Sequence, residues 1–407
     1  MQIQEKAHRI LQQSVCDNCL GRQFAQLLSG LTNRERGKLL RTLIAMSMDK
    51  EHYEGDIELS NFHGFQFHKF ESKDKLEKKR CVICEGMFDN LDKLAEKIAK
   101  VAKKYEFSTF LVGTKLSFEL ISREENLWER VGIDYCEPLK AELNRELGKV
   151  VEKKVKARYH SRPDINFVIS LPEGTVDVQI NPIFIYGEYQ KLVRGIPQTR
   201  WPSKKYKTSI EEIMAVPFMK VTRGASHKLH GLGREDIDAR CLGWRPFVLE
   251  ILEPRSRTLN LKSLSKKIGK GIRVRNLRLS NIEEVRRIKE ERADKTYRAL
   301  VLCEGISRKD LQKLRALVGE IKQKTPERVV HRRADKFRHR KLKSLKTKYV
   351  SSKKFTIEVR CEAGLYVKEL VSGDNGRTTP SASSILQQPC ICKELDVTAI
   401  HNLKAKK

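Results

Sequence analysis

The chain has 407 residues, which is too long for one ordinary hydrophobic core and predicts two or three domains. Its 82 lysines and arginines outnumber 52 acidic residues, and the formal net charge of +30 predicts an anionic partner, of which nucleic acid is the expected one. No apolar run approaches the roughly 20 residues that span a bilayer, which argues against a membrane surface as the partner. Residues 1–8 lack the apolar core of a secretory signal, so we expect a cytoplasmic protein.

Cysteines stand out near the N-terminus. Ten are present, and a reducing compartment argues against a disulfide framework for them. Cys16 and Cys19 form one Cys-x-x-Cys pair, and Cys81 and Cys84 form another. Each pair can hold one edge of a tetrahedral metal, so we predict a closed structural zinc site. A redox pair and ordinary buried cysteines remain alternatives, and we expect the other six to act as small apolar residues: Cys136, Cys241, Cys303, Cys361, Cys390 and Cys392.

The first half of the chain alternates helical and strand-like patterns. Apolar residues recur at spacings of three and four over 20–47 and again over 91–105, and a lysine- and glutamate-rich helix is expected at 140–157. This order predicts a small α/β unit with a mixed sheet. The strands are expected at 110–113, 165–170, 175–180 and 183–186.

A segment at 184–201 interleaves aromatic and cationic side chains. Such a pattern can stack on bases and contact phosphates, and we assign Arg194 and Arg200 to RNA binding. The alternative is a strand that leaves the sheet with Tyr186 and Tyr189 half-buried. A proline and a lysine-rich stretch follow, so we place the domain boundary near Trp201, with domains at 1–201 and 202–407.

The second half is expected to begin with a helix at 210–215 and a strand at 218–223. A charged turn follows Gly231 and Gly233, and the apolar run 247–252 after it predicts a buried strand. These charges have two possible roles. Aspartate side chains could cap and close the loop, or one carboxylate could be kept ionised by neighbouring guanidinium groups so that it can take part in a reaction. By pattern alone, capping is favoured. The charged residues are Arg234, Glu235, Asp236, Asp238 and Arg240.

The string Gly233-Arg-Glu-Asp236 resembles the catalytic loop of pseudouridine synthases. Its continuation to Gly243 and Arg-Pro-Phe247 resembles, more narrowly, the archaeal and eukaryotic tRNA pseudouridine synthases that carry an N-terminal THUMP-type RNA-binding region. The string Arg-Gly-Ile-Pro-Gln-Thr-Arg-Trp at 194–201 is similar to the end of that region. The chain is therefore identified as an archaeal member of the family, which also carries a zinc site in its N-terminal region.

That resemblance implies roles for the loop residues. Asp236 would be the nucleophile, Arg234 would contact the substrate, and Asp238 and Arg240 would support Asp236 from beside it.

Four downstream segments complete the implied site. Tyr297, at the start of a strand that follows a helix at 281–294, would stack on the target uracil. Gly364-Leu-Tyr-Val-Lys368 is similar to the Gly-Thr-Tyr-Ile-Arg segment of other family members, so Lys368 would pair with Asp236. Tyr366, Val367 and Leu395 would contact or close over the base. The cation-rich segment 321–341 would contact phosphates through Arg332, Arg333 and Lys336, although for any single lysine a solvated helix face is the favoured interpretation.

The implied activity is isomerisation of uridine to pseudouridine in the T arm of tRNA, at uridine 54, uridine 55 or both. We expect no organic cofactor, and we expect a monomer. The implied fold is α/β: a zinc- and THUMP-containing RNA-binding region, then a catalytic domain with a mixed, largely antiparallel sheet. One alternative is a noncatalytic THUMP-type tRNA-binding chaperone. Another is an RNA methyltransferase, which is disfavoured because no Gly-x-Gly-type cofactor loop follows a strand.

Overall fold

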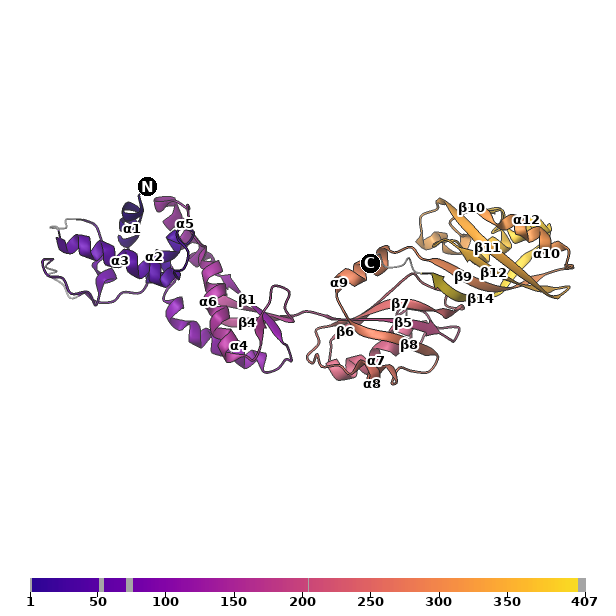
Figure 1. Ribbon diagram of the computed structural model, residues 1–407, viewed down its shortest axis with the longest axis horizontal. Helices are drawn as coiled ribbons and strands as arrows, with labels where there is room; N and C mark the ends of the chain where they lie inside the picture. The colour runs from indigo at the N-terminus through magenta and orange to yellow at the C-terminus, as the bar shows by residue number, and fades with distance from the viewer. Residues whose placement is uncertain (1, 51–54, 71–75, 204, 402–407) are drawn as a thin grey trace. The chain divides into compact units, whose positions relative to one another are not determined.

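The computed structural model describes residues 2–50, 55–70, 76–203 and 205–401, with the side chain of Arg332 excepted (Figure 1). The chain divides into two compact units, Met1–Asn181 and Pro182–Lys407, which are described in turn. Within the described residues, the helices are all too short or too polar to cross a membrane.

The first unit begins with short helices packed around the cysteine pairs. Gly21 of α2 and Gly37 of α3 lie at their contact: a Cβ on Gly21 would fall 1.8 Å from the carbonyl oxygen of Asn33, so only glycine allows this approach. The single helix predicted at 20–47 is therefore wrong, because residues 25–32 turn the chain back and Gly30 has φ +93°. The elements are α1 (Ile3–Leu11), α2 (Asp17–Gly21), η1 (Arg22–Phe24), α3 (Asn33–Lys50), η2 (Leu59–Phe62) and η3 (Met87–Asn90).

A four-stranded mixed sheet completes this unit. Strand order is β2-β1-β3-β4, with β1 parallel to β2 and β3, and β4 antiparallel to β3. Helix α6 packs against α4 and β1, and its buried residues Leu143, Leu147 and Val151 recur at helical spacing. The predicted mixed sheet is confirmed. The elements are α4 (Leu91–Ala102), β1 (Thr109–Leu116), α5 (Phe118–Val131), α6 (Leu139–Lys154), β2 (Arg158–Tyr159), β3 (Ile165–Leu171) and β4 (Thr175–Ile180).

The second unit is built on a ten-stranded sheet. Its order is β13-β10-β11-β12-β9-β14-β7-β5-β8, and β6 pairs with β7 off this path. Among the described strands, pairing is antiparallel except between β7 and β14, where Val397 lies opposite Cys241. The strands are β5 (Ile183–Lys191), β6 (Ser226–Gly231), β7 (Arg240–Leu252), β8 (Ile272–Ser280), β9 (Asp294–Cys303), β10 (Gly319–Lys324), β11 (Phe337–Ser351), β12 (Lys354–Cys361), β13 (Thr378–Thr379) and β14 (Cys390–His401).

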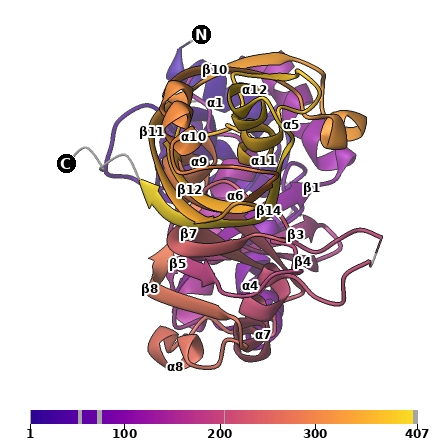
Figure 2. The same ribbon diagram turned by 90° about the vertical axis from the view of Figure 1, so that its right-hand side faces the viewer.

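Helices cover both faces of β7. Phe247, Leu249 and Ile251 face α7, while Val248 lies with the buried residues of α9. This double coverage explains the continuous apolar run and confirms the buried strand predicted there. Helices α10 and α12 lie beside β9–β12 in both views (Figures 1 and 2), and α11 contacts α12 and β14. The helices are α7 (Ile210–Thr222), α8 (Leu261–Ser265), α9 (Ile282–Glu290), α10 (Asp310–Lys313), η4 (Leu314–Leu317), η5 (Glu327–Arg332), α11 (Val367–Ser372) and α12 (Ala382–Leu386).

Two features of the second unit differ from the sequence predictions. The strand predicted at 218–223 is wrong, because α7 continues through Pro217 and buries Phe218 and Thr222 on one face. The strand predicted at 183–186 exists as β5, but it pairs with β7 and β8 in the second sheet. The units accordingly divide between Asn181 and Pro182, whereas the predicted domain boundary lies near Trp201.

Candidate active site

A cleft of about 960 Å³ opens in the second unit. Its walls include the loop between β6 and β7, the start of β9, the turn before α11, and β14, and residues of α9, of η5 and of the segment 195–206 also line it. The central strands of the sheet thus bring together segments that are distant in sequence. A cleft of this size can hold a nucleotide.

The loop between β6 and β7 enters the cleft from a constrained backbone. Gly233 has φ +75°, a left-handed conformation that favours glycine. A Cβ there would lie 3.3 Å from a guanidinium nitrogen of Arg245 and 3.4 Å from Nζ of Lys295, so the glycine also leaves room for these buried cations. Beyond it the amide of Ala239 donates to the carbonyl of Asp236 (3.0 Å), which closes a tight turn.

The side chain of Glu235, next to Asp236 in this loop, is buried. It pairs with the Nε of Arg245 at 3.0 Å, and both side chains are almost fully buried. The hydroxyl of Tyr189 donates to the same carboxylate at 3.1 Å. Burial, reinforced by the charge of Glu235, raises the pKa of Tyr189, so this hydroxyl keeps its proton.

Lys191, at the end of β5, and Gln198, in the segment after it, hold the loop backbone. Lys191 donates to the carbonyls of Ile237 (2.8 Å) and Asp236 (3.3 Å), and Gln198 donates to the carbonyl of Gly233 (3.1 Å). Burial lowers the pKa of Lys191. The loop is therefore fixed by side chains beneath it, which is what a pre-organised site requires.

The carboxylate of Asp236 projects from this loop and is 35% exposed. Its Oδ2 lies 3.4 Å from Nζ of Lys368 and 3.3 Å from Nη2 of Arg328. Each cation has a second carboxylate: Lys368 contacts both oxygens of Asp238 at 2.8 Å, and Arg328 contacts Glu369 at 2.6 Å. Asp236 is thus held between two cations that are themselves anchored.

The pair formed by Lys368 and Asp238 shifts both pKa values. Burial alone would raise the pKa of Asp238, but the hydrogen bond and charge of Lys368 outweigh it and lower that pKa. Burial alone would likewise lower the pKa of Lys368, but the same partner and the charge of Asp236 raise it. Lys368 therefore stays cationic beside Asp236 over the physiological pH range.

The other residues predicted to contact the substrate line the same cleft. Gly364 (φ +92°) lies in the turn between β12 and α11, and Tyr366 is the residue directly before α11. The Tyr366 hydroxyl accepts a hydrogen bond from Arg333 at 2.7 Å. Tyr297 comes from β9, where β12 and β14 flank it. The lining residues with predicted roles are Arg234, Asp236, Tyr297, Tyr366, Val367, Lys368 and Leu395.

Two predicted roles do not match the structure. Arg240 pairs with Asp396 (2.7 Å) and so ties β7 to β14 instead of supporting Asp236 directly. Arg194 donates to the carbonyls of Asp238 and Leu395 (both 2.8 Å) and pairs with Asp396 (2.7 Å). Its guanidinium is occupied in fastening the loop, so it is not a free phosphate contact.

The remaining predicted RNA contacts lie at the surface. Arg200 and Lys336 are exposed, although Nε of Arg200 lies 3.7 Å from Glu212, and Arg333 lies exposed at the cleft. The side chain of Arg332 lies outside the described part of the chain.

Sequence reasoning missed Arg328 and Glu369. Arg328 belongs to the cation-rich segment but was not singled out, because nothing in its spacing distinguishes it from its neighbours. Glu369 follows Lys368 directly, and only the turn of α11 shows that it faces Arg328 and is buried.

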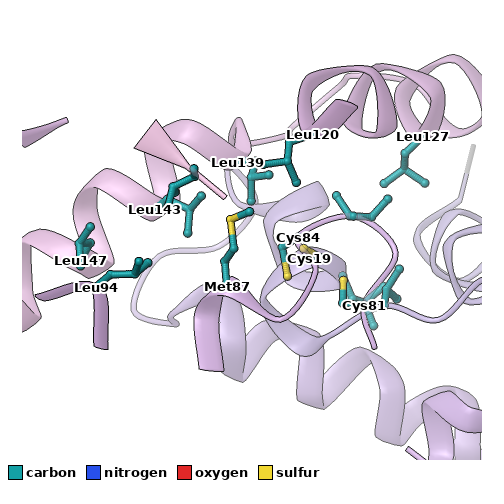
Figure 3. Packing of buried hydrophobic residues seen from close by; sticks show 14 of the residues in the cluster. Cys19, Cys81, Cys84, Met87, Leu94, Leu120, Leu127, Leu139, Leu143 and Leu147 are labelled. Carbon is teal, nitrogen blue, oxygen red and sulfur yellow. The ribbon is translucent and has the colours of Figure 1, made fainter. Parts of the chain in front are cut away.

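In the first unit the two cysteine pairs converge. The four sulfurs lie within 4.8 Å of one another, and Cys16 Sγ is 3.6 Å from Cys84 Sγ, close to the roughly 3.8 Å expected for thiolates around one tetrahedral zinc. Figure 3 shows Cys19, Cys81 and Cys84 beside Met87 and buried leucines. The four cysteines could bind a metal ion.

Arg22 places a buried positive charge near this cluster. It is fully buried and pairs with Glu124, and its Nε and Nη2 have no hydrogen-bond partner of the kind that an oxygen would supply. Its charge interacts with Cys19. A guanidinium placed beside the cluster suits a metal bound by four thiolates, whose net charge is negative.

In the second unit Cys390 has a sulfur neighbour: its Sγ lies 2.9 Å from that of Cys303 across the β9–β14 pair.

Comparison with known proteins places these features in a family. Residues 184–401 match the family model described as Pus10, C-terminal, and residues 94–170 match the Pus10 THUMP domain, archaeal. The tRNA pseudouridine synthase Pus10 of Pyrococcus furiosus is 40% identical over 406 residues, covering 98% of each chain. That of Methanocaldococcus jannaschii is 41% identical, covering 95% of this chain and 92% of its own.

Among solved structures, a chain of a Cbf5-Nop10-Gar1 complex is similar over 51% of this chain and 47% of its own, with a TM-score of 0.32 and 18% identity. A likeness this weak supports no argument about this protein. The full-length similarity does: the chain belongs to the Pus10 family of tRNA pseudouridine synthases.

Proposed function

We propose that this protein converts uridine to pseudouridine in tRNA, with Asp236 as the nucleophile. The observation that carries the proposal is the position of Asp236: its Oδ2 lies 3.3–3.4 Å from Arg328 and Lys368 at the wall of a nucleotide-sized cleft. The relatives named above are tRNA pseudouridine synthases, and their similarity to this protein extends over nearly the whole chain. A net charge of +30 suits an RNA substrate.

The reaction is an isomerisation, so the substrate and the product have the same composition. The N1–C1′ bond breaks, uracil turns within the cleft, C5 bonds to C1′, and the proton on C5 leaves while one is gained at N1. Asp236 acts by attacking C1′, by adding to C6 of the base, or by assisting elimination to a glycal. In each route Lys368 and Arg328 hold the carboxylate in line with its target.

Aromatic and apolar residues receive the base. We assign stacking on the flipped uracil to Tyr297, contact with the nucleotide to Tyr366, Val367 and Arg234, and closure over the base to Leu395. Tyr297 is a poor acceptor for the C5 proton, because burial raises the pKa of its hydroxyl and keeps it protonated at neutral pH.

We assign RNA docking to the first unit and infer that its four cysteines hold a structural zinc ion, which would fix the N-terminal helices and take no part in the chemistry. The surface cations Arg200, Arg333 and Lys336 would contact phosphates. We further propose the T arm as the target, at uridine 54, uridine 55 or both, and a cytoplasmic monomer as the acting form.

Incubation with unmodified tRNA transcripts tests the function. Pseudouridine mapped by carbodiimide-dependent reverse-transcription stops should appear in the T arm with the native protein and be absent with Asp236→Asn, which keeps the side-chain size. A transcript with a disrupted T arm should remain unmodified. No product from the native protein on intact transcripts would leave RNA binding without catalysis as the better account.

A further inference from the structure

Lys295 occupies an unusual place at the floor of the cleft. It lines the cleft but is only 7% exposed. It lies two residues before Tyr297 on β9, so both side chains project from the same face of the sheet. Its Nζ lies 3.4 Å from the position a Cβ on Gly233 would take, directly behind the loop that carries Asp236.

The charges around Lys295 leave it without a carboxylate partner. Its ammonium donates to the carbonyl of Ala293 (3.1 Å), and it makes no ion pair with any residue that the structure describes. Arg245 and Cys241 face it from β7, Cys361 from β12, and Asp294 precedes it on β9. Arg245 is itself paired with Glu235. Burial, with the charge of Arg245 beside it, lowers the pKa of Lys295 to about 8.

A buried cation without a counter-ion is destabilising, so its presence calls for an explanation in the reaction. Lys191 provides a contrast, because it is also buried but donates to two loop carbonyls and is not among the residues that line the cleft. Holding the loop therefore does not require Lys295. An anion that is present in the cleft during the reaction would supply the negative partner that Lys295 lacks.

The proposed reaction generates such an anion. When the N1–C1′ bond breaks, the electron pair stays with uracil, and the negative charge spreads over N1, O2 and O4. We propose that Lys295 is a catalytic residue that stabilises this detached uracil anion while the base turns from N1 to C5. The inference rests on the proposed isomerase activity. Lys295 would act as the donors of an oxyanion hole do, because its positive charge lies where negative charge develops during the reaction.

Single-turnover rates on a T-arm transcript test the idea. Lys295→Met should slow pseudouridine formation about 100- to 1,000-fold, the range found for removal of one such stabilising donor. The tRNA dissociation constant should be unchanged, because the uridine in the bound ground state is neutral. Lys295→Arg, which keeps the charge, should retain more activity than Lys295→Met.

The pH profile separates this role from support of the loop. The native rate should fall as pH rises through about 8, where Lys295 loses its proton. Lys295→Arg should lack this fall because arginine stays charged. Lys191→Met, which disturbs only the loop, should be slower but keep the fall.

Three results would overturn the inference: a Lys295→Met rate within about threefold of native, equal losses in rate and tRNA affinity, or the same pH profile for native and Lys295→Arg proteins. The arginine variant decides the matter if the methionine variant fails to fold. A native protein that makes no pseudouridine would instead refute the proposed function itself.

Discussion

Replacing Arg245 by methionine should strongly destabilise the second unit. Arg245 and Glu235 have side-chain exposures of 0% and 1% and lie 3.0 Å apart, so solvent screens neither charge. Arg245→Met would leave Glu235 buried beside Tyr189 without its cation. Loss of one partner from a buried pair costs about 3–5 kcal/mol, which is a large part of the stability of a typical domain.

The double variant Glu235→Gln/Arg245→Met should recover most of that loss. It removes both charges, and the glutamine can still accept from the Tyr189 hydroxyl. Arg240→Met is a matched control on the same strand: it breaks an ion pair with Asp396 whose arginine is 38% exposed, and it should cost about 1 kcal/mol or less.

Urea denaturation of the full chain, followed by a probe in the second unit, measures these differences. A loss below about 1 kcal/mol for Arg245→Met, or a double variant less stable than the single one, would refute the reasoning that buried charge holds the catalytic loop. Because that loop carries Asp236, the stable double variant also tests whether the charges are needed for its position: we expect it to remain less active than the native protein.

Other variants test the remaining parts of the account. Arg328→Met should slow single-turnover pseudouridine formation at least tenfold with little change in tRNA affinity; equal loss in both would contradict a role in holding Asp236. Asp238 has a lowered pKa in the folded protein, so the stability it gains from Lys368 is present above its unfolded pKa of about 3.9 and lost as pH falls further. The difference in Tm between native and Asp238→Asn proteins should therefore shrink below about pH 4, and a constant difference would argue against this pair. Tyr297→Phe should retain most activity and Tyr297→Ala little, since stacking needs the ring and not the hydroxyl; the reverse pattern would assign the hydroxyl a chemical role. Cys81→Ser should lower the zinc content from one ion per chain, measured by a chromogenic chelator, and lower the Tm of the first unit.

Sequence patterns anticipated much of the fold because periodic burial is local. The helix near 91–105 follows from apolar spacings of three and four, the helix near 140–157 was expected from its lysines and glutamates, and strands were expected near 165–170 and 175–180; the structure confirms all four. Failures arose where tertiary contacts overrode local signals. The segment 20–47 breaks because two glycines pack backbone to backbone.

Local rules also misjudged α7 and β5. The helix predicted at 210–215 is too short, because α7 continues through Pro217 and packs Phe218 against the sheet. The assignment of β5 to the first half failed to anticipate the second sheet, because strand pairing depends on partners that are distant in sequence.

The candidate site, like the fold, was predicted only in part. Motif resemblance singled out Asp236, Tyr297 and Lys368, and they share one cleft. The resemblance carried no information about Arg328, which reaches Asp236 from a segment rich in cations. Arg194 shows the opposite error, since a cation-and-aromatic pattern cannot reveal that its partners are acidic residues on β14.

Release of tritium from tRNA labelled at C5 of uridine measures the central claim most directly, because C5 loses this hydrogen as a proton once it has bonded to C1′, and pseudouridine cannot form without that loss. The native protein should release tritium into water in an amount equal to the pseudouridine formed. Asp236→Asn should bind the tRNA equally well and release none. Release by Asp236→Asn at the native rate would show that this carboxylate, held by Lys368 and Arg328, is not the group that performs the isomerisation.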